Sequence, residues 1–377
     1  MLNAGPAIRH RCRLIGTRLL LVLLSFVAAC ELVRGGETPY PYLLSASQPV
    51  QVADYADGDS YWIVSTRRAA QHRLDPPSST LEFLRRQEDA SLVTSNGAAM
   101  QAEFRPGVPV IIFVHGSFVT WQDQIDQAKT TNRWIKQAAG GRPLHVIFFD
   151  WPSDGPYTHL FPVDVTVRGE RAEFNGVHLT CLMSLLPPGS PVCLVGHSHG
   201  ARTVLSSLHL MSGGAVQNLM YYGNVGERPL RAVLAAAAVD HDWLNPDERF
   251  GRALCRCEVM NLRNRCDAAL TFYPLSAPFA RPSLANVGFT DGDREELGWL
   301  GYRAIELDVT ELVGKSHTWP HYDQEPAIAA AIAPFALFWE LQQPQQQPQP
   351  QPTGPTLSDA RSTTAVASEP VALSPSR

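Results

Sequence analysis

The sequence lacks the signatures of several large functional classes. Its 377 residues carry a formal net charge of −5, with both signs interspersed. No basic stripe is therefore available to nucleic acid, and we exclude that partner. The chain has no Gly-rich phosphate loop, no dinucleotide fingerprint and no internal repeat. We therefore expect no cofactor.

Cysteine spacing excludes another class of site. Seven cysteines occur without a C-x-x-C pair or metal-ligand spacing, so the sequence predicts no metal site. Cys193 lies in an apolar run and is expected to be a small core residue. A disulfide among Cys255, Cys257 and Cys266 would suit an exported protein, but the spacing does not assign one.

No apolar run is long enough to span a bilayer comfortably. Residues 19–29 form a short apolar run after four arginines and before Cys30, the layout of a secretory signal. Val27-Ala28-Ala29-Cys30 resembles the lipobox of bacterial lipoproteins. We expect a signal peptide over residues 1–29 and a lipid-anchored protein of a bacterial cell envelope. Ordinary signal cleavage and an uncleaved anchor remain alternatives.

Composition divides the rest of the chain. Residues 344–377 are rich in Pro, Gln, Ser and Thr, a composition that predicts a disordered tail. Residues 30–107 form an N-terminal segment with a candidate edge strand at residues 60–68. Residues 108–343 are long enough for one large domain.

Short apolar runs alternate with helical patterns from residue 108 onward. Such alternation predicts an α/β fold, in which a mostly parallel central sheet carries helices on both faces. In such a sheet, the functional residues are expected beyond the carboxyl ends of the strands. Strands are expected at residues 108–116, 144–151, 192–195, 230–240, 257–264 and 302–310. Helices are expected at residues 165–186, from 201 and at 327–341, with another that stops at Gly140.

Gly-His-Ser-His-Gly follows one of these buried strands and precedes a helix. That strand–turn–helix setting is the one a nucleophile elbow requires, and it makes Ser198 the candidate nucleophile. His197 and His199 could suggest a metal pair. Because they flank the elbow serine, their side chains should diverge, and no nearby carboxylate or cysteine completes a tetrahedral set.

Four motifs occur in order along the chain: YWIVSTRR, VIIFVHGS, FFDWPSDG and GHSHG. Together they resemble α/β-hydrolases of the esterase/lipase type, and more narrowly a bacterial family of functionally uncharacterised α/β-hydrolases. The resemblance covers residues 60–341 and implies the α/β-hydrolase fold. His199 departs from it, because Met is usual there. The departure should matter little if the backbone N–H, not the side chain, faces an oxyanion.

The fold implied by this resemblance orders its triad as Ser, acid, His. Asp267 follows the strand at residues 257–264 and is the expected acid, with Asp240 and Asp242 as rivals after the preceding strand. The loop VGKSHTWPHYDQEP resembles the segment that contains the catalytic histidine in many α/β-hydrolases. That alignment makes His317 the base and leaves His321 as its alternative.

These residues predict a serine hydrolase that cleaves carboxylic esters through an acyl-enzyme. The backbone N–H groups of Ser117 and His199 would form the oxyanion hole. The expected partner is a small acyl ester, with thioesters and amides as lesser alternatives. A membrane-anchored binding or scaffolding protein on the same fold is the competing hypothesis. Neither the substrate nor the oligomeric state follows from the sequence.

Overall fold

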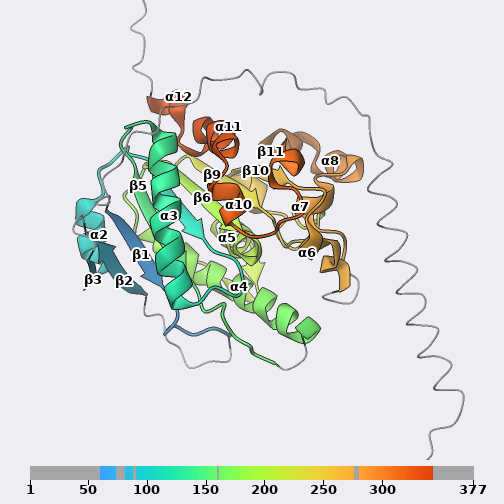
Figure 1. Ribbon diagram of the computed structural model, residues 1–377, viewed down its shortest axis with the longest axis horizontal. Coiled ribbons are helices and arrows are strands. Elements are labelled where there is room, and N and C mark those ends of the chain that lie inside the picture. Colours follow the sequence, from blue (N-terminus) through green and yellow to red (C-terminus); the bar gives the residue numbers. More distant parts are fainter. Residues whose placement is uncertain (1–59, 74–80, 88–90, 159–160, 276–279, 343–377) are drawn as a thin grey trace, which may run out of the picture. The chain divides into compact units, whose positions relative to one another are not determined.

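A nine-stranded sheet forms the centre of the part of the chain that the structure, a computed structural model, describes: residues 60–73, 81–87, 91–158, 161–275 and 280–342. The strand order is β11-β10-β9-β6-β4-β5-β1-β2-β3 (Figure 1). The strands are β1 (Tyr61–Ser65), β2 (Glu82–Arg86), β3 (Leu92–Ser95), β4 (Val110–Val114), β5 (His145–Asp150), β6 (Val192–His197), β9 (Leu230–Ala235), β10 (Glu258–Arg263) and β11 (Ala304–Asp308). A separate hairpin consists of β7 (Ala215–Val216) and β8 (Leu219–Met220).

The middle of the sheet is parallel and buried on both faces. β4 pairs in parallel with β5 and with β6, and every residue of β4 and β6 is buried. Continuous runs such as VIIFV meet this demand, because alternate side chains point to opposite faces and both faces are covered. The predicted α/β class with a mostly parallel central sheet is confirmed.

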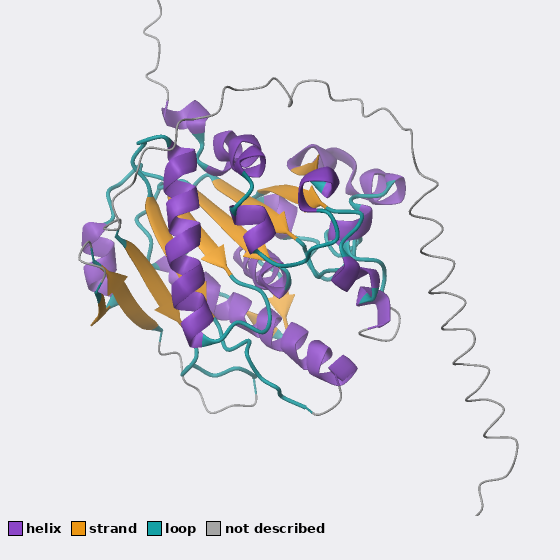
Figure 2. Cartoon of the chain, viewed as in Figure 1, coloured by secondary structure: helices purple, strands orange, loops and turns teal. Residues whose placement is uncertain are grey.

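Helices cover both faces of the sheet (Figures 1 and 2). One layer contains α3 (Trp121–Ala139), α10 (Pro320–Asp323) and α11 (Pro326–Ala336), which contact one another. The other contains α4 (Phe161–Ser184) and α5 (His199–Met211), which pack together extensively. Shorter α-helices are α2 (Gly97–Glu103), α6 (Ala268–Thr271), α7 (Leu284–Val287), α8 (Asp291–Leu297), α9 (Thr310–Val313) and α12 (Trp339–Gln342). The 3₁₀ helices are η1 (Ala253–Cys255), η2 (Tyr273–Leu275) and η3 (Gly298–Arg303).

The expected edge strand at residues 60–68 is wrong in its position. β1 lies between β5, to which it is parallel, and β2, to which it is antiparallel. All five residues of β1 are buried. β3 forms the edge instead, so the segment before residue 108 extends the same sheet by three strands.

Two predicted elements end five residues before the expected position. β9 ends at Ala235 because Ala236 adopts a positive φ of 47°, which breaks the extended backbone. The closing helix ends at Ala336, two residues after Pro334. Phe338, which is buried, has a φ of 52°, and α12 begins only after it.

The predicted signal peptide, Cys30 and the tail at residues 344–377 lie outside the described residues. The chain divides into two units, Met1–Trp339 and Glu340–Arg377. Among the helices that the structure describes, none is long and apolar enough to cross a membrane.

Candidate active site

Ser198 occupies a sharp turn between β6 and α5. Its backbone has φ 54° and ψ −123°, a conformation that costs a non-glycine residue about 1–3 kcal/mol. Backbone hydrogen bonds hold the turn in place. Ser198 N–H donates to Ala235 O at 2.9 Å, and Ala201 N–H donates to Ser198 O at 3.0 Å.

The two glycines of this motif are required by close packing. A Cβ at Gly196 would lie 2.7 Å from Ala201 Cα, and a Cβ at Gly200 would lie 2.2 Å from Val114 O. Neither backbone neighbour can move away cheaply. Glycine therefore lets α5 begin directly against the ends of β6 and β4.

The structure brings Ser198, His317 and Asp267 into one hydrogen-bonded chain. His317 Nε2 lies 2.9 Å from Ser198 Oγ, and His317 Nδ1 lies 2.8 Å from Asp267 Oδ2. The Asp267 side chain is fully buried, whereas that of His317 is 25% exposed. This geometry suits a nucleophile, a base and a carboxylate that orients the base.

Asp267 is itself held by the start of a helix. It is the N-cap of α6, and its Oδ1 accepts a hydrogen bond from Leu270 N–H at 3.0 Å. The other oxygen remains for His317. Because each carboxylate oxygen has a different partner, the carboxylate cannot rotate without losing a bond.

The loops that carry Asp267 and His317 are hydrogen-bonded to each other. Asn264 Nδ2 donates to Gly314 O at 2.9 Å, and Ala268 N–H donates to Lys315 O at 3.2 Å. These bonds join the end of β10 to the segment before His317. The separation of Asp267 from His317 is thus supported by the backbone as well as by the side chains.

A second histidine, which is buried, supports His317. His197 Nε2 lies 2.8 Å from His317 O, and burial lowers the pKa of His197 to about 3. The ring is therefore neutral and donates this hydrogen bond. Trp319 lies between the His197 and Phe113 rings and donates through Nε1 to Thr131 Oγ1 at 2.7 Å.

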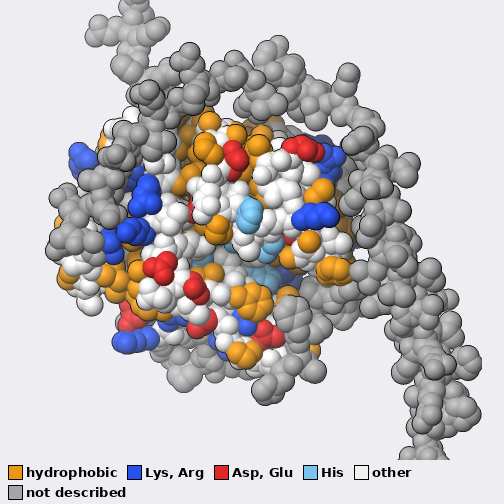
Figure 3. Space-filling view, viewed as in Figure 1, with side chains coloured by type: hydrophobic (Ala, Val, Ile, Leu, Met, Phe, Trp, Pro, Cys, Tyr) orange, Lys and Arg blue, Asp and Glu red, His pale blue; other side chains and the backbone are white. Residues whose placement is uncertain are grey.

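The rival residues have other partners. Asp240 accepts from Tyr273 Oη at 2.7 Å and from Arg281 N–H at 2.9 Å, and Asp242 pairs with the Arg281 guanidinium. His321 is exposed, and its Nδ1 lies 2.8 Å from Ser316 Oγ. Figure 3 shows histidine side chains among apolar ones on the face that carries α10.

Ser117 and His199 meet beside Ser198. Ser117 Oγ lies 2.6 Å from His199 Nδ1. Burial, together with the positive charge of Arg202, holds the pKa of His199 well below its usual value. Among the described residues, the backbone N–H groups of Ser117 and His199 have no acceptor. Both are therefore free to donate to a ligand.

Sequence reasoning missed the support given by His197 and Trp319. His197 occupies a variable position of the Gly-x-Ser-x-Gly pattern, and only folding brings it to a loop 120 residues later. The side chains of His197 and His199 do diverge, toward His317 and Ser117 respectively. No group of three or more potential metal ligands occurs within the described ranges.

Comparison with known proteins identifies the family. The model of the alpha/beta hydrolase family matches residues 111–354, more than half of the chain. The structure is similar to esterase B from Lactobacillus rhamnosis, with 12% identity, a TM-score of 0.39 and coverage of 77% of this chain and 88% of that one. The same esterase inhibited by a C4-C4 SN3 tributyrin phosphonate gives 11% identity, a TM-score of 0.35 and coverage of 75% and 86%. The search of curated proteins found no match. The family match shows that the chain belongs to the alpha/beta hydrolase family.

Proposed function

We propose that the protein is a serine hydrolase that cleaves carboxylic esters. Ser198 is the nucleophile, His317 the general base and Asp267 the residue that orients the base. The observation that carries this proposal is the unbroken chain of bonds at 2.9 Å and 2.8 Å from Ser198 Oγ through His317 to Asp267. Membership of the alpha/beta hydrolase family supports it.

The first half-reaction transfers the acyl group to Ser198. Oγ forms a bond to the ester carbonyl carbon while His317 Nε2 takes the hydroxyl proton, and the carbonyl electron pair moves to oxygen. Asp267 stabilises the imidazolium that results. When the tetrahedral intermediate collapses, the carbon–oxygen bond to the alcohol breaks, and Nε2 returns the proton to the departing oxygen.

The negative oxygen of this intermediate needs donors that are already in place. The backbone N–H groups of Ser117 and His199 fulfil this role in our proposal, because both are free and both flank Ser198. Each such donor is worth about 3 kcal/mol of transition-state stabilisation. Water then attacks the acyl-enzyme with His317 again as base, which releases the acid and regenerates Ser198.

The surface beside Ser117 includes an apolar side chain that suits the acyl chain of an ester. Phe118 directly follows Ser117, is 54% exposed and lies 4.0 Å from the Arg168 guanidinium carbon, which sits over its ring. This ring offers apolar contact area next to the proposed oxyanion hole.

We further propose that the protein is exported and anchored by lipid on Cys30.

A fluorophosphonate probe tests the proposal. We expect rapid labelling of the folded protein and none of Ser198→Ala, together with turnover of short acyl esters in a substrate screen. His321→Gln is the matched control, since His321 is exposed and has no contact with Ser198, and it should label normally. A folded wild-type protein that neither labels nor turns over any ester would favour the non-catalytic scaffold.

A further inference from the structure

We propose that Arg67 is a positioning residue that holds the loop bearing Ser117 in the geometry an oxyanion hole requires. This inference rests on the proposed function and adds a residue to it from outside the triad. Arg67 lies two residues after β1, a strand that the N-terminal segment adds to the sheet. Nothing in the Ser-His-Asp chemistry requires a charge there.

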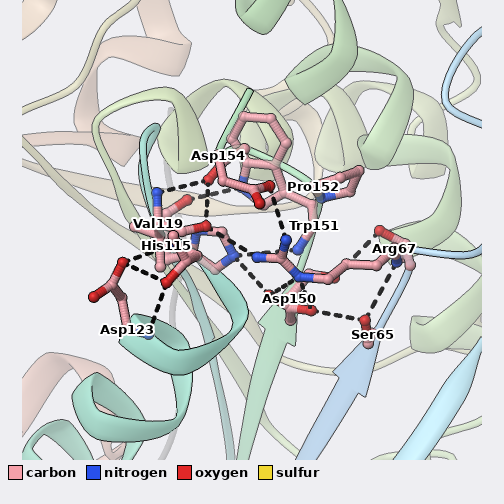
Figure 4. A network of polar contacts seen from close by, with 12 residues as sticks. Ser65, Arg67, His115, Val119, Asp123, Asp150, Trp151, Pro152 and Asp154 are labelled. Atoms are coloured by element: carbon pink, nitrogen blue, oxygen red, sulfur yellow. Dashed lines mark hydrogen bonds and ion pairs between the residues drawn. The ribbon is translucent and has the colours of Figure 1, made fainter. Parts of the chain in front are cut away.

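The three guanidinium nitrogens of Arg67 contact the end of β5, the turn that directly follows it and the loop after β4 (Figure 4). Nε donates to Asp150 Oδ2 at 2.9 Å, Nη1 donates to Asp154 Oδ1 at 2.8 Å, and Nη2 donates to Val119 O at 2.9 Å. The parallel pairing of β1 with β5 explains the first contact, because the carboxyl ends of the two strands meet. The third contact reaches the loop that carries Ser117.

That loop is short and fixed at both ends. It begins after β4 and ends at Thr120, which forms a capping box with Asp123 at the start of α3. Within it, Phe118 has a φ of 63°, a strained value for a residue with a side chain. External bonds must therefore offset the strain and keep the loop in this conformation.

The hydrogen bonds to the loop follow an informative pattern. Phe118 N–H donates to Ser153 O at 2.9 Å, and Val119 N–H donates to Ser153 Oγ at 3.1 Å. Val119 O accepts from Arg67. Phe118 N–H and both backbone polar groups of Val119 are thus engaged, while Ser117 N–H has no acceptor among the described residues. The bond from Arg67 to Val119 O carries a formal charge, and charge-assisted bonds are about twice as strong as neutral ones.

The Arg67 guanidinium is itself fixed in position by Asp150. Asp150 is fully buried and also accepts from Ser65 Oγ at 2.7 Å. Burial alone would raise the pKa of Asp150, but His115 and Arg67 together lower it. The carboxylate is therefore ionised and keeps the guanidinium in one place, where a flexible surface arginine would be ineffective.

Replacement of Arg67 by Lys separates positioning from charge. A lysine ammonium retains the charge that Asp150 needs, but it is a single point and lacks the planar fork that serves three acceptors at once. Loss of the Val119 bond would let Ser117 N–H shift, and a displacement of about 1 Å can reduce the rate of an enzyme about 100-fold. Substrate affinity should be retained, because the oxyanion exists only after attack.

The experiment compares wild type, Arg67→Lys and the matched control Arg68→Lys, whose arginine is 82% exposed and pairs with Glu82 on the surface. We measure kcat and KM for p-nitrophenyl acetate and Ki for an alkyl trifluoromethyl ketone, which Ser198 would convert to an anionic hemiketal. Arg67→Lys should lower kcat about 10- to 100-fold, keep KM within about threefold and raise Ki by the same factor as kcat/KM falls. Arg68→Lys should match wild type.

The other possible results of this experiment would overturn either the inference about Arg67 or the proposed function. Equal kinetics for the two lysine variants, or a fall in kcat without a parallel rise in Ki, would overturn the inference and leave the proposed function intact. A wild type without turnover or probe labelling would overturn the proposed function itself. If Arg67→Lys melts below the assay temperature, Arg67→Gln takes its place. Should both melt, Arg67 is a folding residue and the inference is wrong.

Discussion

Replacement of Asp267 by Asn is the sharpest perturbation of the proposed triad, because the structure dictates how the amide must orient. Leu270 N–H donates to Asp267 Oδ1 at 3.0 Å and needs an acceptor. The Asn oxygen will occupy that site, which places its NH₂ group against His317 Nδ1. Nδ1 must then accept, so the imidazole proton moves to Nε2 and faces Ser198 Oγ. The base is therefore in the wrong tautomer to take a proton.

This change should lower kcat about 10⁴-fold, as expected when a triad histidine is held in the wrong tautomer. The loss corresponds to about 5 kcal/mol of transition-state stabilisation. Stability should change little, since Asn is as good an N-cap for α6 as Asp. Steady-state kinetics on p-nitrophenyl acetate, together with thermal melting, measures both quantities.

Asp240→Asn is the matched control. Asp240 is buried and accepts two hydrogen bonds, but neither comes from His317. Its replacement should affect kcat far less than that of Asp267. A larger loss of kcat at Asp240, or retained activity in Asp267→Asn, would refute the assignment of the acid.

Three further predictions concern packing, pH and localisation. Gly200→Ala would place a Cβ 2.2 Å from Val114 O, so we expect a loss of about 3 kcal/mol or more in urea unfolding, and a smaller loss would contradict the close approach. Burial raises the pKa of Asp323 from 3.8 to about 6, so the folded protein holds this proton to higher pH than the unfolded chain does. The protonated Asp323 side chain therefore contributes stability that is present below about pH 4 and is lost as the pH rises through about 6. In wild type the free energy of unfolding should fall by at most about 3 kcal/mol across this window for this reason, and Asp323→Asn should remove that fall. A stability profile of the variant identical to that of wild type would refute the shift. Cys30→Ser should release the protein from membranes, and an unlipidated mature chain seen by intact mass would disprove the anchor.

The central sheet could be predicted because each buried strand is visible as a short apolar run in the sequence. Parallel strands covered on both faces, such as β4, must be apolar at consecutive positions, and the intervening helices show their own period. The position of Ser198 could also be predicted from the sequence, since a nucleophile elbow consists of five adjacent residues. Both signals lie within one short window.

The remaining features depend on contacts between distant segments. The apolar sequence of β1 is the same whether it lies at an edge or inside a sheet, and its partner β2 has mostly half-exposed residues that give little pattern. Asp240 and Asp267 each follow a strand, so only the folded chain shows which one lies against His317. Arg67 and Val119 are 52 residues apart, so no local sequence pattern predicts the hydrogen bond between them.

The most direct test of the central claim is to find where the acyl group goes. During turnover of p-nitrophenyl acetate, rapid acid quenching followed by peptide mass spectrometry should detect an acetyl group on the peptide that contains Ser198. The modified residue should be Ser198, and the signal should vanish in Ser198→Ala. Turnover without any acetylated peptide, or with the acetyl group on another residue, would contradict the proposed acyl-enzyme mechanism.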